Sequence, residues 1–131
     1  MSQFLAPLNA TIGKKLEKGK HRAVVTLQRN FCYSSDMLGY VRVPTGFVSD
    51  GASVPQALWS IYPPFGKYLE AAVIHDYYCV LGNKGESPID SVTAAKLFRE
   101  VMQVCGVSKW RRTKMYWAVR IGGPKFDAVP E

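Results

Sequence analysis

The sequence predicts an α+β protein in which a small antiparallel sheet comes first along the chain and helices follow it. Alternation of apolar and polar residues is confined to the first third of the chain, whereas apolar residues recur at helical spacing from Ser53 onward. With 131 residues the chain is long enough for one hydrophobic core, so we expect a single domain in which the sheet packs against three to four helices.

The first third is expected to supply a basic arm and then the strands of the sheet. In the strand that follows the arm, Val25 and Leu27 share one face, and Thr26 lies on the other. Pro44 indicates an edge or a bend, because proline cannot donate to a strand ladder. In order, the sequence predicts an arm over 1–20, a domain over 21–131 that begins with a strand over 21–33, a turn over 34–39 and an extended segment over 40–48.

Four helical segments follow, and several have recognisable ends. Ser53, Asp90 or Ser91, and Ser108 are suitable N-caps, because their side chains can accept a hydrogen bond from the first helical turn. Gly82 and Gly85 are expected to end the second helix, which is apolar on nearly every side and should be the central buried helix. The segments are 54–61, 67–82, 92–106 and 109–123, and residues 94, 97, 98, 101, 102 and 105 form an apolar stripe on the third.

Composition sets only general limits on the possible functions. The 17 Lys and Arg residues against 10 Asp and Glu give a basic protein of formal charge +7, which favours anionic partners such as phospholipid or nucleic acid. The N-terminus lacks the pattern of a signal peptide, and no apolar run has the length of a membrane span. The 3 cysteines form no metal-binding or disulfide pattern, so we expect reduced thiols.

The strongest candidate site is the pair His75–Asp76 in the middle of the central helix. Adjacent helical residues diverge by about 100°, so at least one of the two must point into protein. A buried carboxylate is costly unless it is paired or binds a cation. Asp50, in the loop GFVSDGASVP, is one candidate partner, and we expect it within hydrogen-bonding or one-water reach of the pair. The alternative is structural: Asp76 accepts hydrogen bonds from the loop and fixes it to the helix.

The loop, the downstream AAVIHD segment and the basic-aromatic segment KMYWAVRIGG resemble the phage and prophage family called domain of unknown function thirteen fifty-three. The resemblance covers about residues 40–123. It implies a phage origin, with phage structural proteins or a bacterial host target as partners. It also implies a location in the host cell cytoplasm or in the virion, but no particular activity.

The His–Asp helix also resembles that of secreted phospholipases. That resemblance implies that His75 is a general base and that Asp76, with Asp50, holds a divalent cation, calcium in preference to zinc. The sequence departs from the phospholipase pattern at two positions. Cys79 stands where a tyrosine is expected, and Ala95 stands where an aspartate would orient the histidine.

Two further sites are suggested by local patterns. His75 and Cys79 share a helix face, so with Asp50 or Cys105 they could bind zinc. In the last helix, Arg111, Arg112 and Lys114 alternate with aromatic residues, a pattern suited to nucleic acid or an anionic surface. The favoured interpretation of that helix is an amphipathic one, whose apolar residues Trp110, Met115, Trp117 and Val119 enter the core.

The sequence leaves open whether the protein is an enzyme. One hypothesis is a hydrolase-like phage protein that acts on a host envelope component, such as a phospholipid or wall polymer, during entry or lysis, through His75, Asp76 and Asp50. The second is a non-catalytic phage tail or virion component, or a protein that binds a host factor, in which the polar centre is purely structural. The third is a nucleic-acid binder that uses the basic arm and the last helix.

Overall fold

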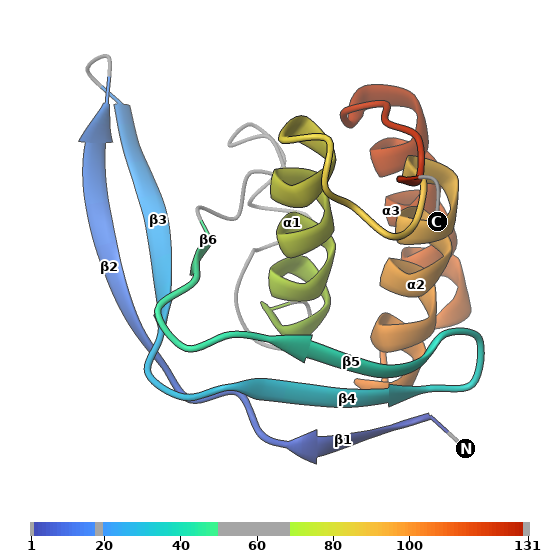
Figure 1. Ribbon diagram of the computed structural model, residues 1–131, viewed down its shortest axis with the longest axis horizontal. Coiled ribbons are helices and arrows are strands. Elements are labelled where there is room, and N and C mark those ends of the chain that lie inside the picture. Colours follow the sequence, from blue (N-terminus) through green and yellow to red (C-terminus); the bar gives the residue numbers. More distant parts are fainter. Residues whose placement is uncertain (1, 18–19, 50–68, 130–131) are drawn as a thin grey trace.

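Strands make up the first part of the described chain and helices the second, as the computed structural model of the protein shows (Figure 1). The structure describes residues 2–17, 20–49 and 69–129. The elements within these ranges are β1 (Gln3–Ala6), β2 (Ala10–Glu17), β3 (Lys20–Leu27), β4 (Phe31–Ser35), β5 (Gly39–Val43), β6 (Val48–Ser49), α1 (Leu69–Asn83), α2 (Ser91–Val104) and α3 (Lys109–Gly122). The predicted α+β class is confirmed; the helix expected over 54–61 lies outside the described residues.

The strands form two antiparallel sheets, with the orders β1-β4-β5 and β2-β3-β6. In Figure 1 the first sheet runs beneath the helices, and the β2–β3 hairpin projects away from it at one side. Burial alternates along β4, where Phe31, Tyr33 and Ser35 are buried and the residues between them are partly exposed. This alternation places one face of the sheet against the helices.

Two expectations about the first third are wrong. Most of the segment expected to be a lightly ordered arm forms β1 and β2, because both strands find antiparallel partners: β1 pairs with β4, and β2 with β3. The single strand expected over 21–33 is two strands, separated by residues 28–30. All three separating residues are exposed, and the Asn30 side chain accepts a hydrogen bond from the Thr45 backbone N–H at 2.8 Å, so this turn braces the next one along the chain.

Helices α2 and α3 begin where capping residues predict. The Asp90 side chain accepts a hydrogen bond from the Thr93 N–H at 2.7 Å at the start of α2, and the Ser108 side chain accepts one from the Arg111 N–H at 3.4 Å at the start of α3. The predicted stripe on α2 is buried at Ala94, Leu97, Phe98, Val101 and Met102, whereas Cys105 is partly exposed.

A carboxylate joins the sheet to α2. The Tyr33 hydroxyl donates a hydrogen bond to Glu100 Oε1 at 2.7 Å, and the Ser2 hydroxyl donates to the same oxygen at 2.8 Å. Burial, and next the hydrogen bond to Glu100, raise the pKa of Tyr33, so the phenol stays protonated and remains a donor. The residues come from β1's flank, β4 and α2, so one acceptor fixes three segments.

The tail after α3 returns to the beginning of α2. The Ser91 N–H donates to the Phe126 carbonyl at 2.9 Å, and the Val129 N–H donates to the Ser87 carbonyl at 2.8 Å. The ring of Phe126 lies so close to Gly82 that a Cβ on this glycine would be 2.3 Å from a ring carbon. Gly82 and Gly85 were expected to mark the end of the helix, and α1 ends between them at Asn83, with Gly85 at a φ of 72° in the following turn. Gly82 lies in the last turn of α1, where its missing side chain makes room for the ring.

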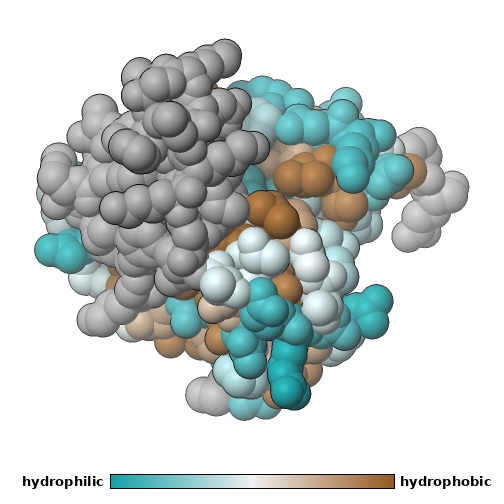
Figure 2. Space-filling model, turned by 90° about the vertical axis from the view of Figure 1, so that its left-hand side faces the viewer, coloured by the Kyte–Doolittle hydropathy of each residue, from teal (hydrophilic) through white to brown (hydrophobic). Residues whose placement is uncertain are grey.

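The outer surface is mixed in character. On the face shown in Figure 2, hydrophobic residues reach the surface near the centre, with hydrophilic residues above and below them. Among the helices that the structure describes, none has the length and apolar character needed to span a bilayer.

The packing of Phe126 on Gly82 can be tested with a double-mutant cycle. Gly82→Ala should destabilise the protein by more than about 1 kcal/mol, because the new methyl group overlaps the ring. In a Phe126→Ala background the same change should be neutral or stabilising by up to about 1 kcal/mol, since alanine favours a helix more than glycine does. Urea unfolding of the four proteins measures the coupling. Equal effects of Gly82→Ala in both backgrounds would show that the two residues do not interact.

Candidate functional site

The polar pair His75 and Asp76 lies in the middle of α1, enclosed by protein. The exposed fractions of the two residues are 4% and 8%. The sequence required at least one of them to point into protein, and both are buried. Neither side chain is without an interaction partner, as the cost of burying polar groups demands.

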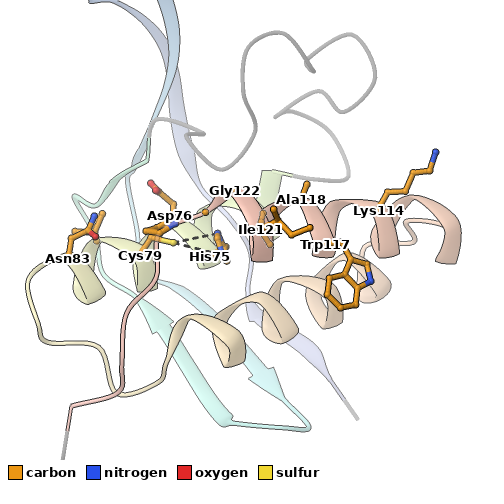
Figure 3. Close-up of a pocket in the computed structure, with 13 residues that line it drawn as sticks. His75, Asp76, Cys79, Asn83, Lys114, Trp117, Ala118, Ile121 and Gly122 are labelled. Carbon is orange, nitrogen blue, oxygen red and sulfur yellow. Dashed lines mark hydrogen bonds between the residues drawn. The ribbon is translucent and has the colours of Figure 1, made fainter.

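A pocket of about 560 Å³ lies between α1 and α3 and has this pair in its wall. In Figure 3 the polar residues of α1 lie at one end of the group, and Lys114 and Trp117 of α3 lie at the other. Most of the α3 wall is apolar. The lining includes His75, Asp76, Cys79 and Asn83 from α1 and Lys114, Trp117, Ala118 and Ile121 from α3. A pocket of this size, with apolar walls and few polar groups, is typical of a small-molecule site.

The imidazole of His75 is held between a thiol and an aromatic ring. Cys79 Sγ lies 3.6 Å from His75 Nδ1, and the ring centroids of His75 and Phe98 are 5.2 Å apart. Burial lowers the pKa of His75 from 6.5 to about 4, so the imidazole is neutral near pH 7. Burial, and next the negative charge of Asp76, raise the pKa of Cys79 to about 12, so its thiol stays protonated.

The two positions at which the sequence departs from the phospholipase pattern, Ala95 and Cys79, can be compared with the surroundings of His75 in the structure. Ala95, which replaces the orienting aspartate, is buried on α2 and brings no polar side-chain atom. The group on α2 whose ring packs against His75 is Phe98 instead. Cys79, the second departure, contacts the imidazole directly. A pairing of His75 with a carboxylate from α2 is therefore not built into this site.

Asp50 and most of its loop lie outside the described residues, so the expected contact between Asp50 and the His75–Asp76 pair stays a prediction. The start of the loop is described. Phe47 packs edge-on against Tyr77, with ring centroids 5.4 Å apart, and the following residues form β6, which pairs with β3. The loop therefore begins beside α1, in contact with Tyr77, the residue that follows Asp76.

The described part of the chain does not assemble a complete metal site. It contains no group of three His, Cys, Asp or Glu side chains placed to hold an ion. Cys105, a candidate zinc ligand, lies with its Sγ 4.0 Å from Glu70 Oε2 rather than in the pocket. Asp76 offers one carboxylate, and its proposed partner for calcium, Asp50, lies outside the described residues.

The basic residues of α3 have different surroundings. Arg111 is exposed, whereas a guanidinium N–H of Arg112 donates to the Val107 carbonyl at 3.1 Å and so braces the start of the helix. Lys114 Nζ lies 3.9 Å from the ring centroid of Trp110. The expectation that the apolar residues of α3 enter the core is correct for Met115 and Val119.

That expectation is wrong for Trp110 and Trp117, which are exposed. The physical reason is helical rotation. At about 100° per residue, both tryptophans lie on the face opposite Met115 and Val119. The sequence analysis therefore missed Trp117 and Ile121 as pocket residues. Counting about 100° per residue from the buried Met115 would have placed both of them outside the core.

Burial of neutral His75 predicts a loss of stability in acid. In the unfolded chain the imidazole titrates near 6.5, and in the folded protein near 4, so the unfolded state binds the extra proton between these values. Stability should therefore fall as the pH drops from 6.5 to 4, with a slope approaching about 1.4 kcal/mol per pH unit. Urea unfolding at several pH values measures this slope. His75→Gln should remove that part of it, and an unchanged slope in the variant would contradict the assignment.

Comparisons with known proteins confirm the family that the sequence resembles. The chain is 46% identical over 84 residues to the uncharacterized protein y4jT of Sinorhizobium fredii (strain NBRC 101917 / NGR234). The match covers 63% of this chain but 24% of that protein, so the shared segment makes up about a quarter of the relative's length. No solved structure matches the chain. The model of the protein family of unknown function DUF1353 matches residues 25–119, and the chain therefore belongs to this family.

Proposed function

We propose that this protein is a hydrolase-like protein that binds an ester-containing amphiphile, such as a phospholipid of a bacterial envelope, in the pocket between α1 and α3. The observation that carries this proposal is the pairing of apolar walls with a neutral imidazole and a carboxylate at one end. Apolar walls suit an acyl chain, and a neutral imidazole can accept a proton at neutral pH.

The residues would have distinct roles. His75 accepts a proton from the water whose oxygen attacks the ester carbonyl, and returns it to the leaving alcohol when the ester C–O bond breaks. In the proposal Asp76, which lines the same pocket, supplies the negative charge for the imidazolium formed in between, a form that burial disfavours. In the proposal Asp50 completes the polar centre from the loop. A calcium ion, where Asp76 and Asp50 hold one, would supply positive charge for the developing oxyanion.

A specific observation favours the second candidate, a non-catalytic protein. His75 contacts Cys79 and Phe98, and the α2 position that would carry an orienting carboxylate is Ala95. In that case the polar pair fixes the loop that begins at β6, and the protein acts as a phage tail or virion component or as a binder of a host factor. The phage origin, and a location in host cytoplasm or virion, stay predictions from the resemblance.

Hydrolysis of phosphatidylglycerol in mixed micelles, and of a soluble short-chain nitrophenyl ester, tests the proposal. His75→Gln and Asp76→Asn should each lower the rate by at least about 100-fold, because a proton acceptor or its stabilising charge is lost. Tyr78→Phe is the matched control, because Tyr78 is also buried on α1 but does not line the pocket. It should leave the rate within about twofold, and thermal melts would confirm that all the variants are folded.

The same assay separates the two candidates. Removal of calcium with a chelator should lower the rate if Asp76 and Asp50 hold the ion. A wild-type protein that hydrolyses neither ester, with or without calcium, would contradict the hydrolase proposal and favour the non-catalytic one. In the non-catalytic case Asp76→Asn should still lower the melting temperature, because the loop loses a charged acceptor.

A further inference from the structure

The outer face of α3 carries large apolar side chains in a row. Trp110, Trp117 and Ile121 have exposed fractions of 69%, 50% and 79%, and Lys114 lies among them. The intervals of four, three and four residues place all four side chains on one stripe of the helix. We call Trp110, Lys114, Trp117 and Ile121 the outer stripe.

The outer stripe has no role in the core. The buried residues of α3 are Met115, Tyr116 and Val119, and at about 100° per residue they lie on the side of the helix opposite the outer stripe. Two tryptophans and an isoleucine on an open helix face cost solubility. A contiguous exposed apolar patch is typical of a site where something binds.

The charge around the outer stripe identifies the kind of partner. The sequence of α3, KWRRTKMYWAVRIG, contains five basic residues and no acidic one. Arg111 is exposed beside the stripe, and Arg120 lies on its other side, with its guanidinium 5.3 Å from the Trp117 ring. Tryptophan and isoleucine flanked by lysine and arginine suit the interface of an anionic bilayer, where apolar side chains enter the acyl region and cations contact phosphates.

We infer that the outer stripe docks this protein on the surface of an anionic phospholipid bilayer. Nucleic acid is the less suitable partner, because base stacking needs an open ring face. Lys114 Nζ occupies one face of the Trp110 ring at 3.9 Å from its centroid, and the Trp117 ring has Tyr116 edge-on and Arg120 beside it, each 5.3 Å away. Ile121, the most exposed member, has no use in stacking but can insert among lipid chains.

Docking would place the pocket at the lipid. Three members of the outer stripe, Lys114, Trp117 and Ile121, also line the pocket that holds His75 and Asp76. One face of α3 would therefore meet the bilayer while its edge opens towards the polar pair. The docking itself does not depend on hydrolysis, and holds for a binding protein as well as for an enzyme.

Sedimentation with vesicles tests the inference. Wild-type protein should bind vesicles of phosphatidylcholine mixed with phosphatidylglycerol, and should bind vesicles of phosphatidylcholine alone more weakly. Trp110→Ala should lower the partition onto the anionic vesicles by roughly tenfold, because a large interfacial side chain is lost. Tyr40→Ala is the matched control, since Tyr40 is 63% exposed but lies on β5, and it should bind as wild type does.

Other outcomes are equally informative. Failure of the wild type to bind anionic vesicles, or an equal loss in Tyr40→Ala, would overturn the inference, as would binding to a labelled oligonucleotide at the same salt concentration without binding to vesicles. Trp110 does not line the pocket, so Trp110→Ala should hydrolyse a soluble ester as wild type does. Vesicle binding without any hydrolysis would retain the docking surface and reject the hydrolase proposal alone.

Discussion

The near-complete burial of α1 is the constraint on which the rest of the structure depends. Residues 71–76 of this helix are all buried, so protein must cover it on almost every side. Apolar side chains on a helix surface of this kind stabilise the fold only when neighbours exclude water from them. Among the described elements, α2 packs along α1 and β6, the strand before the loop, lies against it, and Phe47 on Tyr77 is one of the contacts near that strand.

The same constraint sets the chemistry of the polar pair. Desolvation keeps His75 neutral and Cys79 protonated, so burial has already selected one protonation state for each group. A helix that served packing alone would place apolar residues at these positions at lower cost. The presence of a buried histidine and a buried carboxylate beside a pocket therefore indicates that these two positions of α1 have a role beyond packing, catalytic or structural.

The sequence predicted the helices better than the strands. Helix starts depend on local signals, and the Asp90 and Ser108 caps could be recognised from neighbouring residues. Strand β1 is stabilised by β4, about thirty residues away, and Phe4 stacks on Phe31 with ring centroids 5.5 Å apart. No local pattern contains the β1–β4 pairing, whereas β2 was missed although its partner β3 follows it directly in a hairpin.

Some features of the candidate site could likewise be predicted from one helix, whereas others depend on how the helices pack together. The burial of His75 and Asp76 follows from the character of one helix, and the contact of His75 with Cys79 follows from a spacing of four residues. The packing of Phe98 on His75 depends on how α2 is rotated against α1, which the sequence does not specify. The opening of the pocket beside Trp117 likewise depends on the placement of α3, a tertiary property.

The return of the tail affects the order in which the chain can fold. Phe126 and Val129 hydrogen-bond the segment that connects α1 to α2, and the Phe126 ring lies on Gly82. These contacts join residues about forty positions apart, so they form only after the three helices have come together. The end of α1 and the start of α2 therefore gain these contacts only once the tail after α3 has been synthesised.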